Sequence, residues 1–96
     1  MAFYDPEKEG SDVFIYALST CAHCRAAKKL LTELGVAFDH VDVDTLPEER
    51  MQEALSEMIQ YNPGQTFPTL IIGTRVIVGN REDDIRQAVE KIKGSK

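Results

Sequence analysis

Cys21 and Cys24 stand two positions apart in a chain of 96 residues that contains no other cysteine. An apolar run at residues 13–18 precedes them, and a helical pattern at residues 25–34 follows them. A Cys-x-x-Cys at such a strand-to-helix junction can close a small disulfide ring. It also lies where unpaired backbone N–H groups favour an anion such as a thiolate. The pair therefore predicts redox chemistry or metal binding.

Length and charge limit the class of protein. The 96 residues are enough for one domain with one modest core. A net charge of −5 argues against a general nucleic-acid surface, which needs clustered Lys and Arg. No apolar stretch approaches the roughly 20 residues of a membrane span, and residues 1–12 are too polar and acidic for a signal peptide. We therefore expect a cytoplasmic protein without nucleic-acid or membrane partners. In the cytoplasm a structural disulfide would be reduced.

Hydrophobic periodicity predicts the element order β-α-β-α-β-β-α, in one domain at residues 12–96 after a polar extension at residues 1–11. The expected strands cover residues 13–18, 36–44, 69–72 and 75–78, and the expected helices begin near residues 21, 45 and 80. Thr45 and Asn80 are expected to cap the second and third helices. Gly35 should end the first helix, and Gly73 should open a two-residue hairpin turn. The first two strands, joined by a helix, should be parallel with a right-handed crossover.

This order of elements, together with three short motifs, resembles the glutaredoxin branch of the thioredoxin fold. The motifs are Cys21-Ala22-His23-Cys24, Thr66-Phe67-Pro68 and Gly79-Asn80. The likeness covers roughly residues 12–93. It implies an α/β, thioredoxin-like fold in which a four-stranded mixed sheet has helices on both faces.

The resemblance also implies roles for the two sulfurs. Cys21, at the start of the helix, is expected to attack a substrate disulfide, and Cys24 is expected to be the more buried thiol that closes the disulfide. Thr20 and His23, beside Cys21, are the residues expected to tune its ionisation. A positively charged His23 would favour the thiolate, whereas a fully solvated imidazole would have little effect.

The expected binding residues come from the loop before the third strand and the start of the last helix. Pro68 is predicted to follow a cis peptide bond. The resemblance implies that this proline faces the cysteines and that the backbone before it pairs with the substrate. The resemblance implies glutathione contacts for Gln65, Phe67, Pro68, Asn80, Arg81 and Glu82. The alternative for Asn80 is that it only caps the last helix, together with Asp83.

Two departures from the glutaredoxin pattern and one further resemblance bear on the chemistry. The spacer is Ala22-His23, where glutaredoxins commonly have Pro and Tyr. Leu18 stands three residues before Cys21, where many glutaredoxins carry a Lys that helps to hold glutathione. Residues 79–83, Gly-Asn-Arg-Glu-Asp, resemble the glutaredoxin-like electron donors of ribonucleotide reductase, which take electrons from thioredoxin reductase.

Metal binding is the alternative to thiol exchange. A structural zinc site needs four ligands, and His23 and His40 are the only histidines beside the two cysteines. His40 stands alone in a strand, so no metal site is predicted. An iron–sulfur cluster held by Cys21 and glutathione stays open as an alternative.

The sequence thus predicts a monomeric, cytoplasmic dithiol–disulfide oxidoreductase that uses Cys21 and Cys24. Its expected substrates are protein disulfides or glutathione mixed disulfides, and no bound cofactor is expected. Glutathione is the expected reductant, and a thioredoxin-reductase-type flavoprotein is the alternative.

Overall fold

The structure, a computed structural model, describes residues 13–94. The predicted extension at residues 1–11 lies outside the described residues. Within them, four strands and three α-helices follow the predicted order. None of the helices among residues 13–94 is long and apolar enough to cross a membrane.

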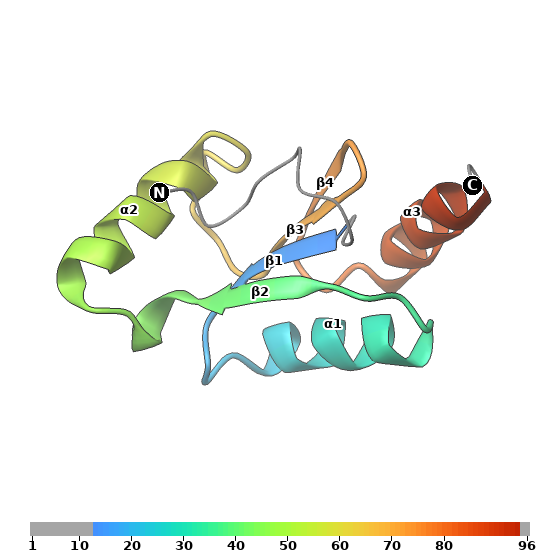
Figure 1. Cartoon of the computed structure of the whole chain (residues 1–96), viewed down its shortest axis with the longest axis horizontal. Coiled ribbons are helices and arrows are strands. Elements are labelled where there is room, and N and C mark those ends of the chain that lie inside the picture. Colours follow the sequence, from blue (N-terminus) through green and yellow to red (C-terminus); the bar gives the residue numbers. More distant parts are fainter. Residues whose placement is uncertain (1–12, 95–96) are drawn as a thin grey trace.

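A four-stranded mixed sheet forms the centre of the molecule (Figure 1), and its strands lie in the order β2-β1-β3-β4. Strand β1 (Val13–Ala17) pairs in parallel with β2 (Asp39–Asp42) and antiparallel with β3 (Thr69–Ile72). Strand β4 (Arg75–Val78) continues from β3 as an antiparallel hairpin. The predicted mixed sheet, with its first two strands parallel, is confirmed.

Alternating side chains of β1 belong to two apolar clusters, one on each face of the sheet. Val13 and Ile15 of β1 belong to the cluster that contains the buried residues of α1 (Ala22–Glu33) and α3 (Glu82–Gly94). Phe14 and Tyr16 belong to the opposite cluster, with the buried residues of α2 (Glu48–Ile59). Both clusters contain fully buried side chains, so the sheet is covered on both faces, as predicted.

The turns that join these elements depend on two glycines. Gly35, with φ +71°, follows the last turn of α1, and its N–H donates to the carbonyl of Thr32 at 3.1 Å. Gly73, with φ +62°, opens the turn between β3 and β4. Both backbone conformations are in the left-handed region that favours glycine, as the sequence predicts.

The prediction of a strand over residues 36–44 is wrong at both ends. The N–H of Val36 donates to the carbonyl of Leu31 at 3.2 Å, which ties this residue to the end of α1. Val43–Thr45 form the 3-10 turn η1, in which the N–H of Leu46 donates to the carbonyl of Val43 at 3.3 Å. Only Asp39–Asp42 therefore pair as a strand.

Both predicted helix caps are also wrong. The hydroxyl of Thr45 donates to the carbonyl of Asp42 at 2.7 Å, and Pro47 occupies the N-cap position of α2. Helix α3 starts at Glu82, two residues after Asn80, and its first turn contains the bond from the Ile85 N–H to the Arg81 carbonyl. Thr45 therefore bonds within the turn before α2, and Asn80 lies too early in the chain to cap α3.

Candidate active site

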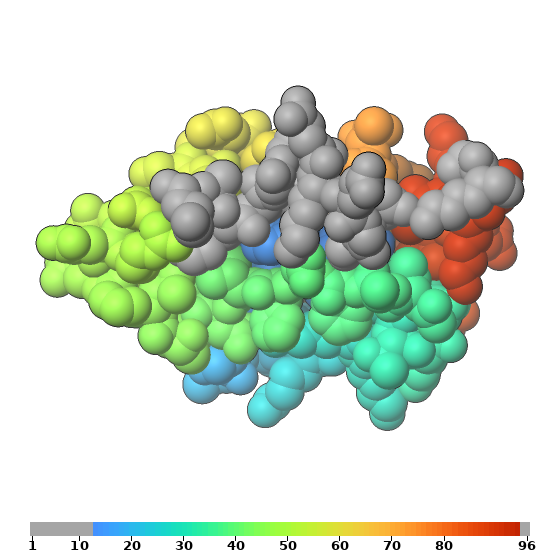
Figure 2. Space-filling model, in the orientation of Figure 1, coloured from blue at the N-terminus to red at the C-terminus, as the bar shows by residue number. Residues whose placement is uncertain are grey.

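Cys21 occupies the N-cap position of α1. Its backbone is extended (φ −83°, ψ 119°), and its sulfur accepts the N–H of Cys24 at 3.3 Å. The Cys21 N–H donates to the carbonyl of Leu18 at 3.2 Å, which closes the turn before the helix. In Figure 2 this turn, in light blue, and the start of α1, in cyan, protrude at the lower edge of the molecule. The first sulfur of the pair thus sits half-buried at an accessible helix start.

The surroundings of Cys21 favour its thiolate. Burial of the sulfur raises its pKa, but hydrogen bonds from the Cys24 thiol and from the N–H groups of Cys24 and His23 outweigh this effect. The positive charge of Arg25 acts in the same direction, and the net pKa lies below the ordinary value of 9.0. Because a thiolate is the attacking form of cysteine, Cys21 has the properties of a nucleophile.

Cys24 has the opposite character. Its side chain is 0% exposed and packs in the cluster between α1, α3 and the sheet. Burial, hydrogen bonding to the Cys21 sulfur and the charge of that sulfur raise the Cys24 pKa to about 12. Both thiols are free, so one reactive and one protonated sulfur lie side by side in the reduced protein.

The loop before β3 meets the same apolar cluster. Phe67 packs against both core clusters, and Cys21 packs against the one that contains Cys24. The peptide bond between Phe67 and Pro68 is cis, as predicted. The Pro68 carbonyl accepts the N–H of Gly79 at 2.8 Å, so the loop before β3 and the segment before α3 adjoin.

The other predicted ligand residues lie in this loop and in the segment that leads into α3. Gln65 is exposed and has φ +54°, and Arg81 and Glu82 are exposed at the start of α3. The guanidinium of Arg81 lies 3.7 Å from the carboxylate of Asp84. The side-chain oxygen of Asn80 is buried and has no hydrogen-bond partner within residues 13–94. Their role toward glutathione stays a prediction.

The two residues predicted to tune Cys21 differ in what they contribute. His23 is exposed, and it affects the sulfur through its backbone N–H. Thr20 is exposed in the turn before Cys21, and its side chain makes no hydrogen bond to the described residues. An effect of the His23 imidazole also stays a prediction.

Comparison with known proteins agrees with this geometry. The family model described as Glutaredoxin matches residues 13–77.

The chain belongs to the glutaredoxin family. Glutaredoxin 3 of Escherichia coli K12 is 33% identical over 69 residues, which cover 72% of this chain and 77% of that protein. The crystal structure of Methanosarcina acetivorans methanoredoxin has a TM-score of 0.77 and 44% identity, over 81% of this chain and 83% of that one. The glutaredoxin-like NrdH-redoxin of Escherichia coli has a TM-score of 0.61 and 27% identity, over 78% and 91% of the two chains. Glutaredoxins are in general thiol–disulfide oxidoreductases, and membership of the family implies an activity of this general kind.

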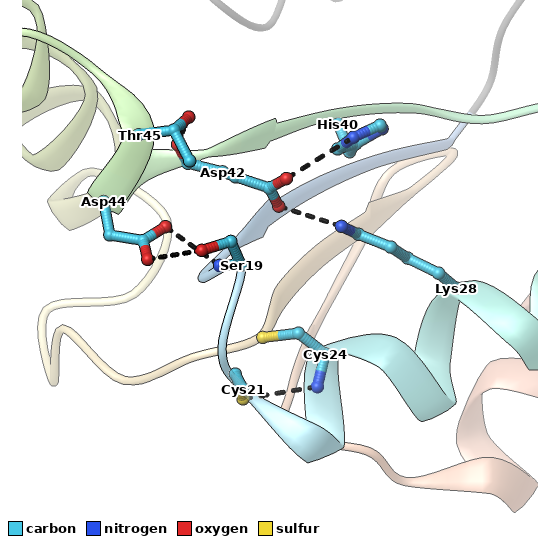
Figure 3. A network of polar contacts seen from close by, with 8 residues as sticks. All are labelled: Ser19, Cys21, Cys24, Lys28, His40, Asp42, Asp44 and Thr45. Carbon is cyan, nitrogen blue, oxygen red and sulfur yellow. Dashed lines mark hydrogen bonds and ion pairs between the residues drawn. The ribbon is translucent and has the colours of Figure 1, made fainter.

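Two polar contacts beside the glutaredoxin cysteines were not expected from the sequence (Figure 3). The N–H and hydroxyl of Ser19 donate to the carboxylate of Asp44 at 2.9 and 2.6 Å, which ties the turn before Cys21 to η1. The ammonium of Lys28 donates to the carboxylate of Asp42 at 2.8 Å, and its charge lowers the pKa of Cys24 in opposition to burial. The alternating acids at the end of β2 are the one sequence signal for these contacts.

Metal ligands do not converge in the described part of the chain. No group of three or more His, Cys, Asp or Glu side chains suited to a metal ion lies within residues 13–94. His40 lies with its Nε2 atom 3.9 Å from the carboxylate of Asp42. An iron–sulfur cluster held by Cys21 and glutathione stays a prediction.

Proposed function

We propose that the protein is a dithiol–disulfide oxidoreductase that reduces disulfides through Cys21 and Cys24. The unequal ionisation of the two sulfurs is the observation that carries this proposal. The lowered pKa of Cys21 favours a thiolate on the half-buried sulfur, and burial keeps the Cys24 thiol protonated until it is needed. Thiol exchange needs this combination, because one sulfur must attack first and the other must wait.

The reaction follows from the two states. The Cys21 thiolate attacks one sulfur of a substrate disulfide, forms a mixed disulfide with it and releases the other sulfur as a thiolate. Cys24 then loses its proton, attacks Cys21 and releases the second substrate sulfur. The substrate gains two electrons, and the protein is left with a Cys21–Cys24 disulfide.

Protein disulfides and glutathione mixed disulfides are the proposed substrates. The N–H and C=O of Phe67 make no hydrogen bond to the described residues. Both groups are therefore available to pair with an extended substrate segment in the manner of an added strand. Gln65, Asn80, Arg81 and Glu82 are proposed to contact glutathione, since Gln65 lies in the same loop and the other three follow Gly79, whose N–H bonds to the Pro68 carbonyl.

Two electron sources are compatible with this site, and glutathione is the first. The second is a thioredoxin-reductase-type flavoprotein, which two observations favour. The solved structure of NrdH-redoxin is described as that of a glutaredoxin-like protein with a thioredoxin-like activity profile. Leu18, before Cys21, presents an apolar side chain that packs against the α2 cluster and offers no charge to a glutathione carboxylate. We further propose a monomer that works in the reducing cytoplasm.

A coupled assay tests the proposal and separates the two electron sources. The protein would be given insulin as a disulfide substrate, with NADPH and either glutathione plus glutathione reductase or thioredoxin reductase. Consumption of NADPH with the first system alone supports glutathione, and consumption with the second alone supports the flavoprotein. Failure of Cys21→Ser to lose activity, or absence of turnover with both systems, would contradict the proposed function.

A further inference from the structure

Asn62 is a buried polar residue in the loop between α2 and β3. The residue is 7% exposed, and its N–H donates to the carbonyl of Met58 at 2.8 Å, just beyond the end of α2. A buried carboxamide costs free energy unless its donors and acceptor are paired. The partners of this side chain are therefore informative.

The Asn62 carboxamide bonds to the loop that contains Pro68. Its Nδ2 atom donates to the Thr66 carbonyl at 3.2 Å, the Thr66 hydroxyl at 3.1 Å and the Thr69 hydroxyl at 3.0 Å. These three acceptors share the two hydrogens of the amide. Its Oδ1 atom accepts the N–H of Gly64 at 3.1 Å. Backbone bonding adds to this, because the N–H of Gln65 donates to the Asn62 carbonyl at 3.1 Å.

Thr69 completes the arrangement from the start of β3. Its side chain is 0% exposed, and its hydroxyl donates to the Thr66 carbonyl at 2.8 Å. The Thr66 carbonyl therefore has two donors, which lie on either side of Phe67 and Pro68 in the chain. Because these donors hold the loop from the core side, the Thr66 carbonyl is not available to a substrate.

The peptide groups of Phe67 lie between two fixed points. The Thr66 carbonyl is held by Asn62 and Thr69, and the Pro68 carbonyl is held by the N–H of Gly79 at 2.8 Å. Phe67 itself keeps an N–H and a C=O without partners among residues 13–94. The network fixes the backbone on both sides of Phe67 and does not use the N–H or the C=O of Phe67 itself.

We infer that Asn62 and Thr69 are positioning residues for substrate binding, because their hydrogen bonds to Thr66 hold the Phe67 peptide where an extended protein segment pairs with it beside Cys21. This inference rests on the proposed function, and it concerns those proposed substrates whose disulfide is flanked by peptide groups. A small disulfide that lacks a flanking peptide cannot use the Phe67 groups. The two residues therefore act on the binding of protein substrates and leave the reactivity of Cys21 unchanged.

Steady-state kinetics with two substrates test the inference. Insulin supplies a disulfide flanked by polypeptide, and 5,5′-dithiobis(2-nitrobenzoate) supplies a small aromatic disulfide. We expect Asn62→Ala and Thr69→Val to lower kcat/KM for insulin about tenfold through a higher KM, because each removes at least one hydrogen bond from the Thr66 carbonyl. Reduction of the small disulfide should stay within about twofold of wild type.

Two further variants serve as controls. Thr69→Ser keeps the hydroxyl and should restore the insulin KM, whereas a role in packing alone would not be rescued in this way. Tyr16→Phe removes another side-chain hydrogen bond, from Tyr16 to Glu57 at 2.6 Å, and should leave the insulin KM unchanged. If Asn62→Ala does not fold, the Thr69 pair decides the question.

The outcomes separate this inference from the proposed function. Parallel losses for both substrates, or an insulin KM that stays at the wild-type value in Thr69→Val, would overturn the inference while wild-type activity upholds the function. A wild-type protein that reduces neither substrate would overturn the proposed function, and the inference with it.

Discussion

Formation of a mixed disulfide on Cys21 should change the ionisation of Cys24. In the reduced protein, three effects raise the Cys24 pKa to about 12: burial, the hydrogen bond to the Cys21 sulfur and the charge on that sulfur. A disulfide sulfur has no charge, so the third effect disappears and the second weakens once Cys21 has reacted. Burial remains, because Cys24 is 0% exposed. The Cys24 pKa in the intermediate should therefore fall below about 12 and stay above the ordinary value of 9.0.

The magnitude follows from these two bounds. With a pKa between the ordinary thiol value and that of reduced Cys24, the thiolate fraction at neutral pH is about 10⁻² to 10⁻⁵. The rate at which Cys24 resolves the intermediate is proportional to this fraction. It should therefore rise about tenfold for each pH unit from about pH 6 to pH 8.

Stopped-flow reaction with 5,5′-dithiobis(2-nitrobenzoate) measures both steps. Attack by Cys21 releases one nitrothiolate, and resolution by Cys24 releases a second, so the absorbance should rise in two phases. The second phase should follow the pH dependence given above and be absent in Cys24→Ser. A second phase whose rate is independent of pH in this range would refute the reasoning, because Cys24 would then already be ionised.

Three other experiments test contacts around the site and the fold. Cys24→Ala should raise the pKa of Cys21, because it removes the thiol hydrogen bond but keeps the N–H groups; alkylation of Cys21 by iodoacetamide at neutral pH should slow several-fold, and an unchanged rate would contradict this. The Lys28–Asp42 pair is about one-fifth exposed, with side chains at 22% and 23%, so a double-mutant cycle with Lys28→Met and Asp42→Asn in urea unfolding should give a coupling of about 1–2 kcal/mol. A coupling near zero would show that the pair is solvent-screened. Gly73→Ala should lower the free energy of unfolding by about 1–2 kcal/mol, since φ is +62° and the new methyl would lie 2.9 Å from a methyl of α3; equal stability would mean that the turn relaxes.

Much of the fold could be predicted because its signals are local. The apolar run of β1, the helical spacing of Cys24 with the leucines of α1, and Gly35 after that helix each determine an element from a few neighbouring residues. The second strand was predicted too long because Val41 and Val43 alternate with acids as in a strand. In the structure Val43 begins a 3-10 turn, and alternation alone does not distinguish the two.

The candidate site also contains features with a local sequence signal and features that depend on tertiary contacts. The place of Cys21 at the helix start, the burial of Cys24 and the cis bond between Phe67 and Pro68 could be predicted, because two short motifs mark them. The network of Asn62 could not, because its partners become neighbours only when the loop closes over the sheet. A polar residue after a helix ordinarily reads as a solvated loop residue, and its 7% exposure is a tertiary property.

The central claim is that two adjacent sulfurs differ in ionisation, and site-resolved alkylation tests it most directly. The reduced protein would be pulsed with iodoacetamide across a range of pH, and mass spectrometry would give the extent of modification at each cysteine. We predict that Cys21 titrates below the ordinary thiol pKa of 9.0, whereas Cys24 stays unmodified until far more alkaline pH. Two cysteines that react together with one ordinary pKa would contradict the account.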